Sequence, residues 1–265
     1  MSDKMKTSNI HQAVSSVVHY VEDLLAHPQA MRGQMLRGTG PVAEFEQLLG
    51  QRCGFPYCLA TCNATSALLT AVLAAGLSGK SVAIMDGAWL GSLGVLRLAG
   101  VHEVPFDKSP AFDMTSCSAV LAADPSDGRH DTEAIRELCD ESGIWYIEDT
   151  GWLPGFAAPT DDRSLADIQV LSFGPGKAIC LGEGGAILCR DESFYHRAVA
   201  LSQHPERAMA EHGSLDGVPL LNARMHPLAA VIGVELLRRR DDTHCQPVLR
   251  EGDDWMEPYW AGYAS

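Results

Sequence analysis

Apolar residues recur along the chain in short runs that alternate with longer amphipathic segments. The short runs, typical of buried strands, are residues 57–60, 82–85, 101–106, 119–122, 144–147 and 168–173. The amphipathic segments, typical of helices, are residues 10–26, 42–52, 63–73 and 132–141, and a further helix is expected after Trp89. Strands that alternate with helices at this spacing predict an α/β fold, with a mostly parallel sheet covered on both faces. Sites in such sheets lie beyond the carboxyl ends of the strands.

Lys177 is the first candidate for chemistry at that edge. It ends the run Ser-Phe-Gly-Pro-Gly-Lys at residues 172–177, is followed by Gly-Glu-Gly-Gly at residues 182–185, and is the last of five lysines in the chain. A lysine among glycines and apolar residues can lose its proton through desolvation and form a Schiff base with an aldehyde. The alternative is a solvated lysine after a glycine-rich turn.

Asp149 is the second candidate, because it ends the apolar run at residues 144–147. A carboxylate there could keep a ring nitrogen protonated, although an acid at a strand end also caps helices. Hydroxyls and free amides at residues 63–66 begin a helix, where anions bind well. The order of strand, Asp149, second strand, hydroxyl, glycines and lysine favours a site for pyridoxal 5'-phosphate.

Composition excludes several other classes of function. The 265 residues carry a net charge of −14, which argues against a nucleic-acid partner. We see no secretory leader and no apolar run of membrane-spanning length, so no membrane partner is expected. Eight cysteines lack Cys-x-x-Cys spacing and ten histidines lack a His-x-x-x-His pair, which favours a cytoplasmic protein without a metal site.

Five stretches in this order resemble the DegT/DnrJ/StrS-type sugar aminotransferases, which are fold type I pyridoxal-phosphate enzymes. They are residues 36–46, 63–68, 147–149, 172–177 and 182–185, and the lysine run with its glycine tail is the most specific. The resemblance covers about residues 33–240, which implies that this part is the cofactor-binding large domain. Residues 1–32 would form an N-terminal helical segment, and residues 241–265 a short aromatic tail where relatives continue into a small domain.

The resemblance also assigns roles to single residues. Lys177 would form the Schiff base and then carry a proton to or from the substrate, and Asp149 would pair with the pyridinium nitrogen. The cofactor phosphate would be held by hydroxyls and amides of Thr65, Ser66 and Ser172.

Two further positions match the family, and each has a plainer alternative. Trp89 corresponds to the aromatic residue that stacks on the cofactor ring, or it is an ordinary core tryptophan. Asn222 lies in a Leu-Asn-Ala-Arg-Met stretch at residues 221–225. In the family this asparagine reaches the phosphate of the neighbouring subunit, which implies a homodimer or a heterodimer with a related subunit; otherwise Asn222 is a loop residue.

The sequence departs from the family at three points. Trp152 occupies a cofactor-binding position where relatives usually place Gln or His near the cofactor hydroxyl, and Ala64 replaces the usual glycine of the phosphate turn. The small C-terminal domain is largely absent, so the pocket is open, closed by a partner chain, or covered by the aromatic tail.

The expected function is therefore that of a pyridoxal-phosphate enzyme in a specialised biosynthetic pathway, acting on a small amino or keto substrate. Aminotransfer is the default reaction. The alternatives are a lyase, decarboxylase or cyclase on the same scaffold, and a catalytically degenerate subunit that completes a full-length partner. Candidates for binding a substrate carboxylate are Arg37, Arg207 and Arg224, and the alternative for each is a structural or surface residue.

Overall fold

The computed structural model describes residues 3–85, 88–106, 114–123, 131–150, 164–175, 177, 179–213 and 221–238. Helices in these ranges are α1 (Asp3–Ala26), α2 (Pro28–Arg37), α3 (Pro41–Cys53), α4 (Ala64–Ala74), α5 (Leu90–Leu98), a 3-10 turn (Met114–Ser116), α6 (Thr132–Ser142), α7 (Glu192–Ser202), α8 (Pro205–His212) and α9 (Pro227–Arg238). The strands are β1 (Tyr57–Thr61), β2 (Ser81–Ile84), β3 (His102–Pro105), β4 (Ala119–Ala123), β5 (Trp145–Thr150), β6 (Ile168–Ser172) and β7 (Gly185–Cys189).

The strands described here form one seven-stranded sheet in the order β1-β7-β6-β5-β4-β2-β3. Strand β7 runs antiparallel to both of its neighbours, and the other pairings are parallel. The mostly parallel sheet is therefore confirmed. Because β1 and β6 run in the same direction on either side of β7, their carboxyl ends and the start of β7 lie at one edge of the sheet.

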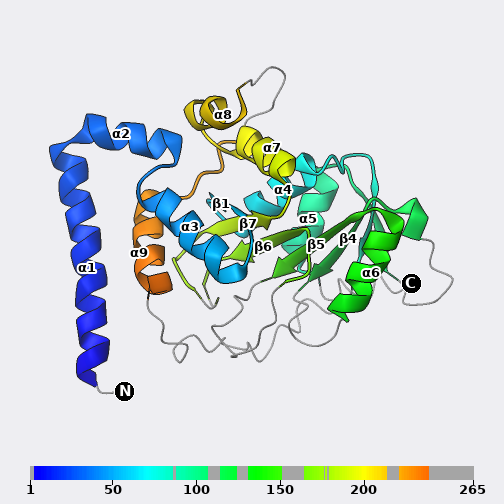
Figure 1. Ribbon diagram of the computed structural model, residues 1–265, viewed down its shortest axis with the longest axis horizontal. Helices are drawn as coiled ribbons and strands as arrows, with labels where there is room; N and C mark the ends of the chain where they lie inside the picture. The colour runs from blue at the N-terminus through cyan, green and yellow to red at the C-terminus, as the bar shows by residue number, and fades with distance from the viewer. Residues whose placement is uncertain are drawn as a thin grey trace.

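Both faces of the sheet are buried under helices (Figure 1). Residues at alternate positions of the strands, such as Leu59 and Ile187, pack with α4, α5 and α7 on one face. Their chain neighbours Ala60 and Leu188 pack with α3 and α9 on the opposite face. On the same face as α3 and α9, Ile135 of α6 packs with residues of β4 and β5 in a further apolar cluster. Burial on both faces explains why the central strands read as apolar runs rather than as an alternating pattern, whereas the outer strand β3 is exposed or only partly buried.

Several elements differ from the sequence-based expectation. The predicted helix at residues 10–26 begins earlier, at Asp3, and packs beside α9 (Figure 1). Helix α2 extends to Arg37 and α3 begins at Pro41, so only three residues separate these two helices. Gly38 ends α2 in the left-handed conformation, with φ 63°. Helices α2, α7, α8 and α9 and strand β7 were not predicted.

Gly233 of α9 allows this helix to lie close to α3. A Cβ atom there would come within 2.4 Å and 2.6 Å of the Phe45 ring, which is fully buried. We therefore predict that Gly233→Ala lowers the free energy of unfolding by about 1–3 kcal/mol, measured by urea denaturation. Gly94→Ala in α5 is the control, because a Cβ there meets nothing within 4 Å. It should raise stability by up to about 1 kcal/mol, and a loss equal to that of Gly233→Ala would contradict the account.

Candidate functional site

The carboxyl edge of the sheet brings Ser172 and the start of α4 together. Ser172 pairs with Gly185 across β6 and β7, and Gly185 pairs with Thr61 across β7 and β1. Two residues after Thr61, Asn63 caps α4. The three strand ends therefore form one row that leads directly into the first turn of this helix.

The start of α4 is a site suited to an anion. Asn63 is extended, and its Oδ1 accepts a hydrogen bond from the Ser66 N–H at 2.7 Å. The first bond of the helix joins the Ala67 N–H to the Asn63 carbonyl at 3.1 Å, so the amides of Ala64 and Thr65 precede the helix's own bonds. Thr65 is exposed and Ser66 is half-buried. These amides, with the positive end of the helix dipole, favour a bound phosphate or carboxylate.

Gly185 makes this arrangement possible. A Cβ atom at this position would lie 2.4 Å from the carbonyl carbon of Asn63 and 2.5 Å from the nitrogen of Ala64. Any side chain would push β7 away from the first peptide of α4. The missing side chain therefore brings the hydroxyl-bearing end of β6 close to the free amides of α4.

Asp149 lies on the same face of the sheet as Ser172. It pairs with Val170 in β6, two residues before Ser172, so the side chains of all three point to the face covered by α4 and α5. The carboxylate is half-buried, and Oδ2 accepts a very short hydrogen bond from Ser92 Oγ. Ser92 is buried in α5 and was not predicted as a site residue. It holds the Asp149 carboxylate in one orientation.

Trp89 is not a core residue, so that alternative is wrong. It directly precedes α5, and 54% of its surface is exposed. Its ring folds back over Gly91, where a Cβ atom would lie 1.8 Å from Cζ3 of the indole. The ring is thus an exposed aromatic surface beside the helix that carries Ser92.

Lys177 lies in the connection between β6 and β7. Its N–H donates to the Gly174 carbonyl at 3.3 Å, and the Gly174 N–H donates to Ser172 Oγ at 3.4 Å. The connection folds back on itself, because the Leu181 N–H reaches the Phe173 carbonyl at 2.8 Å. Lys177 is half-buried and lies five residues beyond Ser172. Trp152 and residues 241–265 lie outside the described residues.

Asn222 belongs to a stretch that lies beside the end of β1. The Cys62 N–H donates to the Ala223 carbonyl at 2.8 Å, and Thr61 forms an isolated bridge with Arg224. Asn222 is exposed and has a left-handed backbone, with φ 52°. The stretch therefore extends the sheet edge next to the chain that enters α4.

The three arginines considered for a substrate carboxylate are engaged by the protein. Arg207 is only 3% exposed and forms a two-bonded ion pair with Glu46, so it is wrong as a substrate clamp. Arg224 Nη1 donates to the Met35 carbonyl at 3.2 Å. Arg37 Nε lies 3.6 Å from a carboxylate oxygen of Glu206 at the surface.

The described residues contain no cluster of three or more His, Cys, Asp or Glu side chains that could hold a metal ion. Within the same ranges, every helix is too short or too polar to cross a bilayer.

Several curated relatives of the chain are named for nucleotide-linked sugars. One is the UDP-4-amino-4,6-dideoxy-N-acetyl-beta-L-altrosamine transaminase of Campylobacter jejuni, 24% identical over 83% of this chain and 62% of the relative. Another is the GDP-perosamine synthase of Escherichia coli O157:H7, 25% identical over 76% of this chain and 58% of the relative. The chain thus spans about three-fifths of the length of these proteins.

Solved structures give the same architecture. DesI, crystallised in the presence of its TDP-sugar product, superposes with a TM-score of 0.65 and 27% identity, covering 85% of this chain and 58% of DesI. The aminotransferase from Psychrobacter cryohalolentis superposes with a TM-score of 0.69 and 22% identity, and the match covers 86% of this chain and 61% of that aminotransferase. These likenesses confirm the expected α/β fold of the pyridoxal-phosphate transferases.

The sequence profile of the DegT/DnrJ/EryC1/StrS aminotransferase family matches residues 19–246, which include every described element of the sheet. The match covers most of the chain. The chain therefore belongs to the DegT/DnrJ/EryC1/StrS aminotransferase family.

Proposed function

We propose that this chain binds pyridoxal 5'-phosphate at the carboxyl edge of the sheet and transfers amino groups to or from a small amino or keto compound. The observation that carries the proposal is the close approach of Gly185 to the first peptide of α4. This approach brings the free amides at the start of α4 next to the strand end that carries Ser172, and together these groups suit a phosphate group. Asp149 lies on the same face of the sheet, where a carboxylate could face a protonated ring nitrogen.

Each residue of the proposed cofactor site would have a role that follows from its chemistry. When bound, pyridoxal phosphate supplies an aldehyde that combines with amines and a ring that accepts electron density from the substrate. The phosphate would be held by the amides of Ala64 and Thr65 and by the hydroxyls of Ser66 and Ser172. Asp149, oriented by Ser92, would hold the proton on the ring nitrogen.

Lys177 would supply the amine that anchors the cofactor, and its Nζ would then move the proton at the reacting carbon of the substrate. Its connection between two buried strands supports this role, because the loop closes on itself near Ser172. Trp89 offers an exposed aromatic surface next to α5 that could cover one side of a flat ring.

We also propose that a second subunit completes the site, in a homodimer or a heterodimer with a related chain. Asn222 supports this, because its exposed side chain is carried by a stretch anchored to the end of β1. The nucleotide-linked amino sugars named in the relatives are the first amino compounds to test, alongside smaller amino and keto acids.

Replacement of Lys177 by alanine tests the anchoring role. We predict that the wild-type protein with pyridoxal phosphate shows a visible absorption band that shifts when an amino donor is added, and that Lys177→Ala lacks this band. Lys80→Ala is the control, because Lys80 is an exposed residue before β2, at the amino edge of the sheet. A band that persists in Lys177→Ala would disprove the proposal.

Gly185→Ala tests the phosphate-binding role of the start of α4. The added Cβ would overlap the peptide between Asn63 and Ala64, so β7 and α4 must separate. We expect affinity for pyridoxal phosphate to fall by roughly tenfold or more, measured by equilibrium dialysis. Gly174→Ala, in the connection that follows β6, is the matched control, since its Cβ would meet only Ser172 Oγ, at an ordinary 3.6 Å. Equal losses in the two variants would count against a phosphate site at the start of α4.

A further inference from the structure

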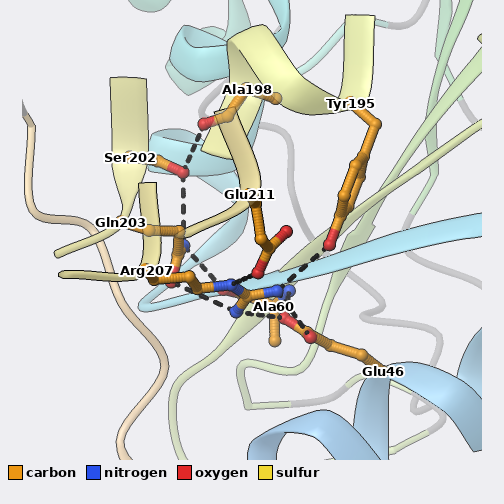
Figure 2. Close-up of polar contacts among 8 residues, drawn as sticks. All are labelled: Glu46, Ala60, Tyr195, Ala198, Ser202, Gln203, Arg207 and Glu211. Atoms are coloured by element: carbon orange, nitrogen blue, oxygen red, sulfur yellow. Dashed lines mark hydrogen bonds and ion pairs between the residues drawn. The ribbon is translucent and has the colours of Figure 1, made fainter. Parts of the chain in front are cut away.

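A buried polar network lies beside β1, which is the edge strand at one end of the described sheet (Figure 2). The network is on the side of β1 that faces away from β7. Its centre is the ion pair between Glu46 of α3 and Arg207 of α8, which are 7% and 3% exposed. Arg207 Nη2 donates to Glu46 Oε2 at 2.9 Å, and Arg207 Nη1 donates to Glu46 Oε1 at 3.1 Å. Two parallel bonds of this kind fix the direction as well as the distance of the pair.

The network binds the two backbone groups of Ala60 that point away from β7. The Ala60 N–H donates to Glu46 Oε1 at 2.8 Å, and the Ala60 carbonyl accepts from Gln203 Nε2 at 3.3 Å. An edge strand exposes backbone groups that need partners, and here two side chains supply them. Two residues later the Cys62 N–H is held by the Ala223 carbonyl. The outer side of the chain is thus fixed just before it enters α4.

Arg207 connects several elements to this edge. Its Nε donates to Glu211 Oε1 at 2.8 Å, and Nη2 also reaches the Tyr195 hydroxyl at 3.2 Å (Figure 2). Burial alone would lower the pKa of Arg207, but Glu46 and Glu211 raise it overall, so the guanidinium keeps its charge. Gly38 fits against it, because a Cβ there would lie 2.4 Å from Arg207 Nη1. Helices α3, α7 and α8 and the turn after α2 therefore meet at one guanidinium.

A buried ion pair of this kind contributes little net stability compared with apolar packing, because both charges lose their hydration. What it does supply is a fixed geometry. Ala60 lies three residues before Asn63, and Thr61 Oγ1 donates to the Asn63 carbonyl at 2.9 Å. A shift of Ala60 would therefore move the first amides of α4.

We propose that Glu46, Gln203 and Arg207 are positioning residues for the phosphate end of the cofactor, because they fix the edge strand that leads into α4. The inference rests on the proposed function. These residues act on the start of α4 from the outer side of β1, whereas Gly185 sets its position from the β7 side. None of the three needs to contact the cofactor.

The test compares two ligands that differ only in the phosphate, pyridoxal phosphate and pyridoxal, binding to the full-length apoprotein. Glu46→Gln keeps the shape of the side chain but turns an amide nitrogen toward Arg207 Nη2, donor against donor. Gln203→Met keeps the length and removes the bond to the Ala60 carbonyl. We expect the preference for pyridoxal phosphate to fall roughly tenfold in each variant, since supporting residues around a ligand site have effects of this size.

The control is Arg136→Gln, which breaks ion pairs with Asp140 and Asp167 at 2.8 Å and 3.0 Å, next to the amino ends of β5 and β6. It should lower stability and leave the ligand preference unchanged. A network that only stabilises the fold would lower affinity for both ligands together, so an unchanged preference in Glu46→Gln and Gln203→Met overturns the inference. An equal fall in Arg136→Gln also overturns it.

Three outcomes separate the positioning inference from the proposed function. If Glu46→Gln does not fold, Gln203→Met decides alone, because it leaves the Glu46–Arg207 pair intact. If the wild-type protein shows no preference for the phosphorylated ligand, the proposed function fails and the inference fails with it. If the wild type has the preference and both variants retain it, only the positioning inference fails.

Discussion

The first peptide of α4 touches the backbone at the start of β7, and the arrangement of the site depends on this contact. Gly185 has no side chain to separate the two, so the ends of β1 and β6 and the start of α4 share one small volume. Backbone amides, a helix dipole and two hydroxyls meet there without requiring a basic side chain. This matters for a chain of net charge −14, whose overall field repels a phosphate. Such a chain must bind an anion through polar groups in direct contact with it, and the contact at Gly185 brings these amides and hydroxyls together.

The positions on either side of this contact are fixed by different means. Toward β5, the sheet register alone sets Asp149 on the α4 and α5 face, and Ser92 then restricts its carboxylate. Toward the outside of the sheet there is no further strand among the described residues, so side chains complete the edge. Glu46 and Gln203 take the two outer backbone groups of Ala60, and Arg207 holds both side chains in place.

Much of the sheet could be predicted because its parallel strands are continuous apolar runs between clear helix starts. Strand β7 is a five-residue buried run of the same kind, and its antiparallel direction leaves no mark in the sequence. The helix start at Asn63 was predictable from its own residues, since the cap and its partner Ser66 are three positions apart. Helix α2 is polar and short, so its sequence did not show a helical pattern of apolar residues.

The residues of the candidate site were likewise only partly predictable from the sequence. Lys177, Asp149, Ser172, Thr65 and Ser66 belong to local motifs, so their order along the chain was enough to propose them. Ser92 and Arg207 were not recognisable, because their partners Asp149 and Glu46 are 57 and 161 residues away. Such contacts depend on the completed fold. Arg207 was one of three candidates for a substrate carboxylate, with a structural role as the alternative, since a buried arginine and a functional one look alike in sequence.

The most direct test of the account asks which lysine the cofactor occupies. The purified protein would be incubated with pyridoxal phosphate and treated with sodium borohydride, which makes the carbon–nitrogen link permanent, and its peptides would be mapped by mass spectrometry. The chain has five lysines, and the account predicts stoichiometric modification at Lys177 alone. Modification at another lysine, or none at saturating cofactor, would contradict it.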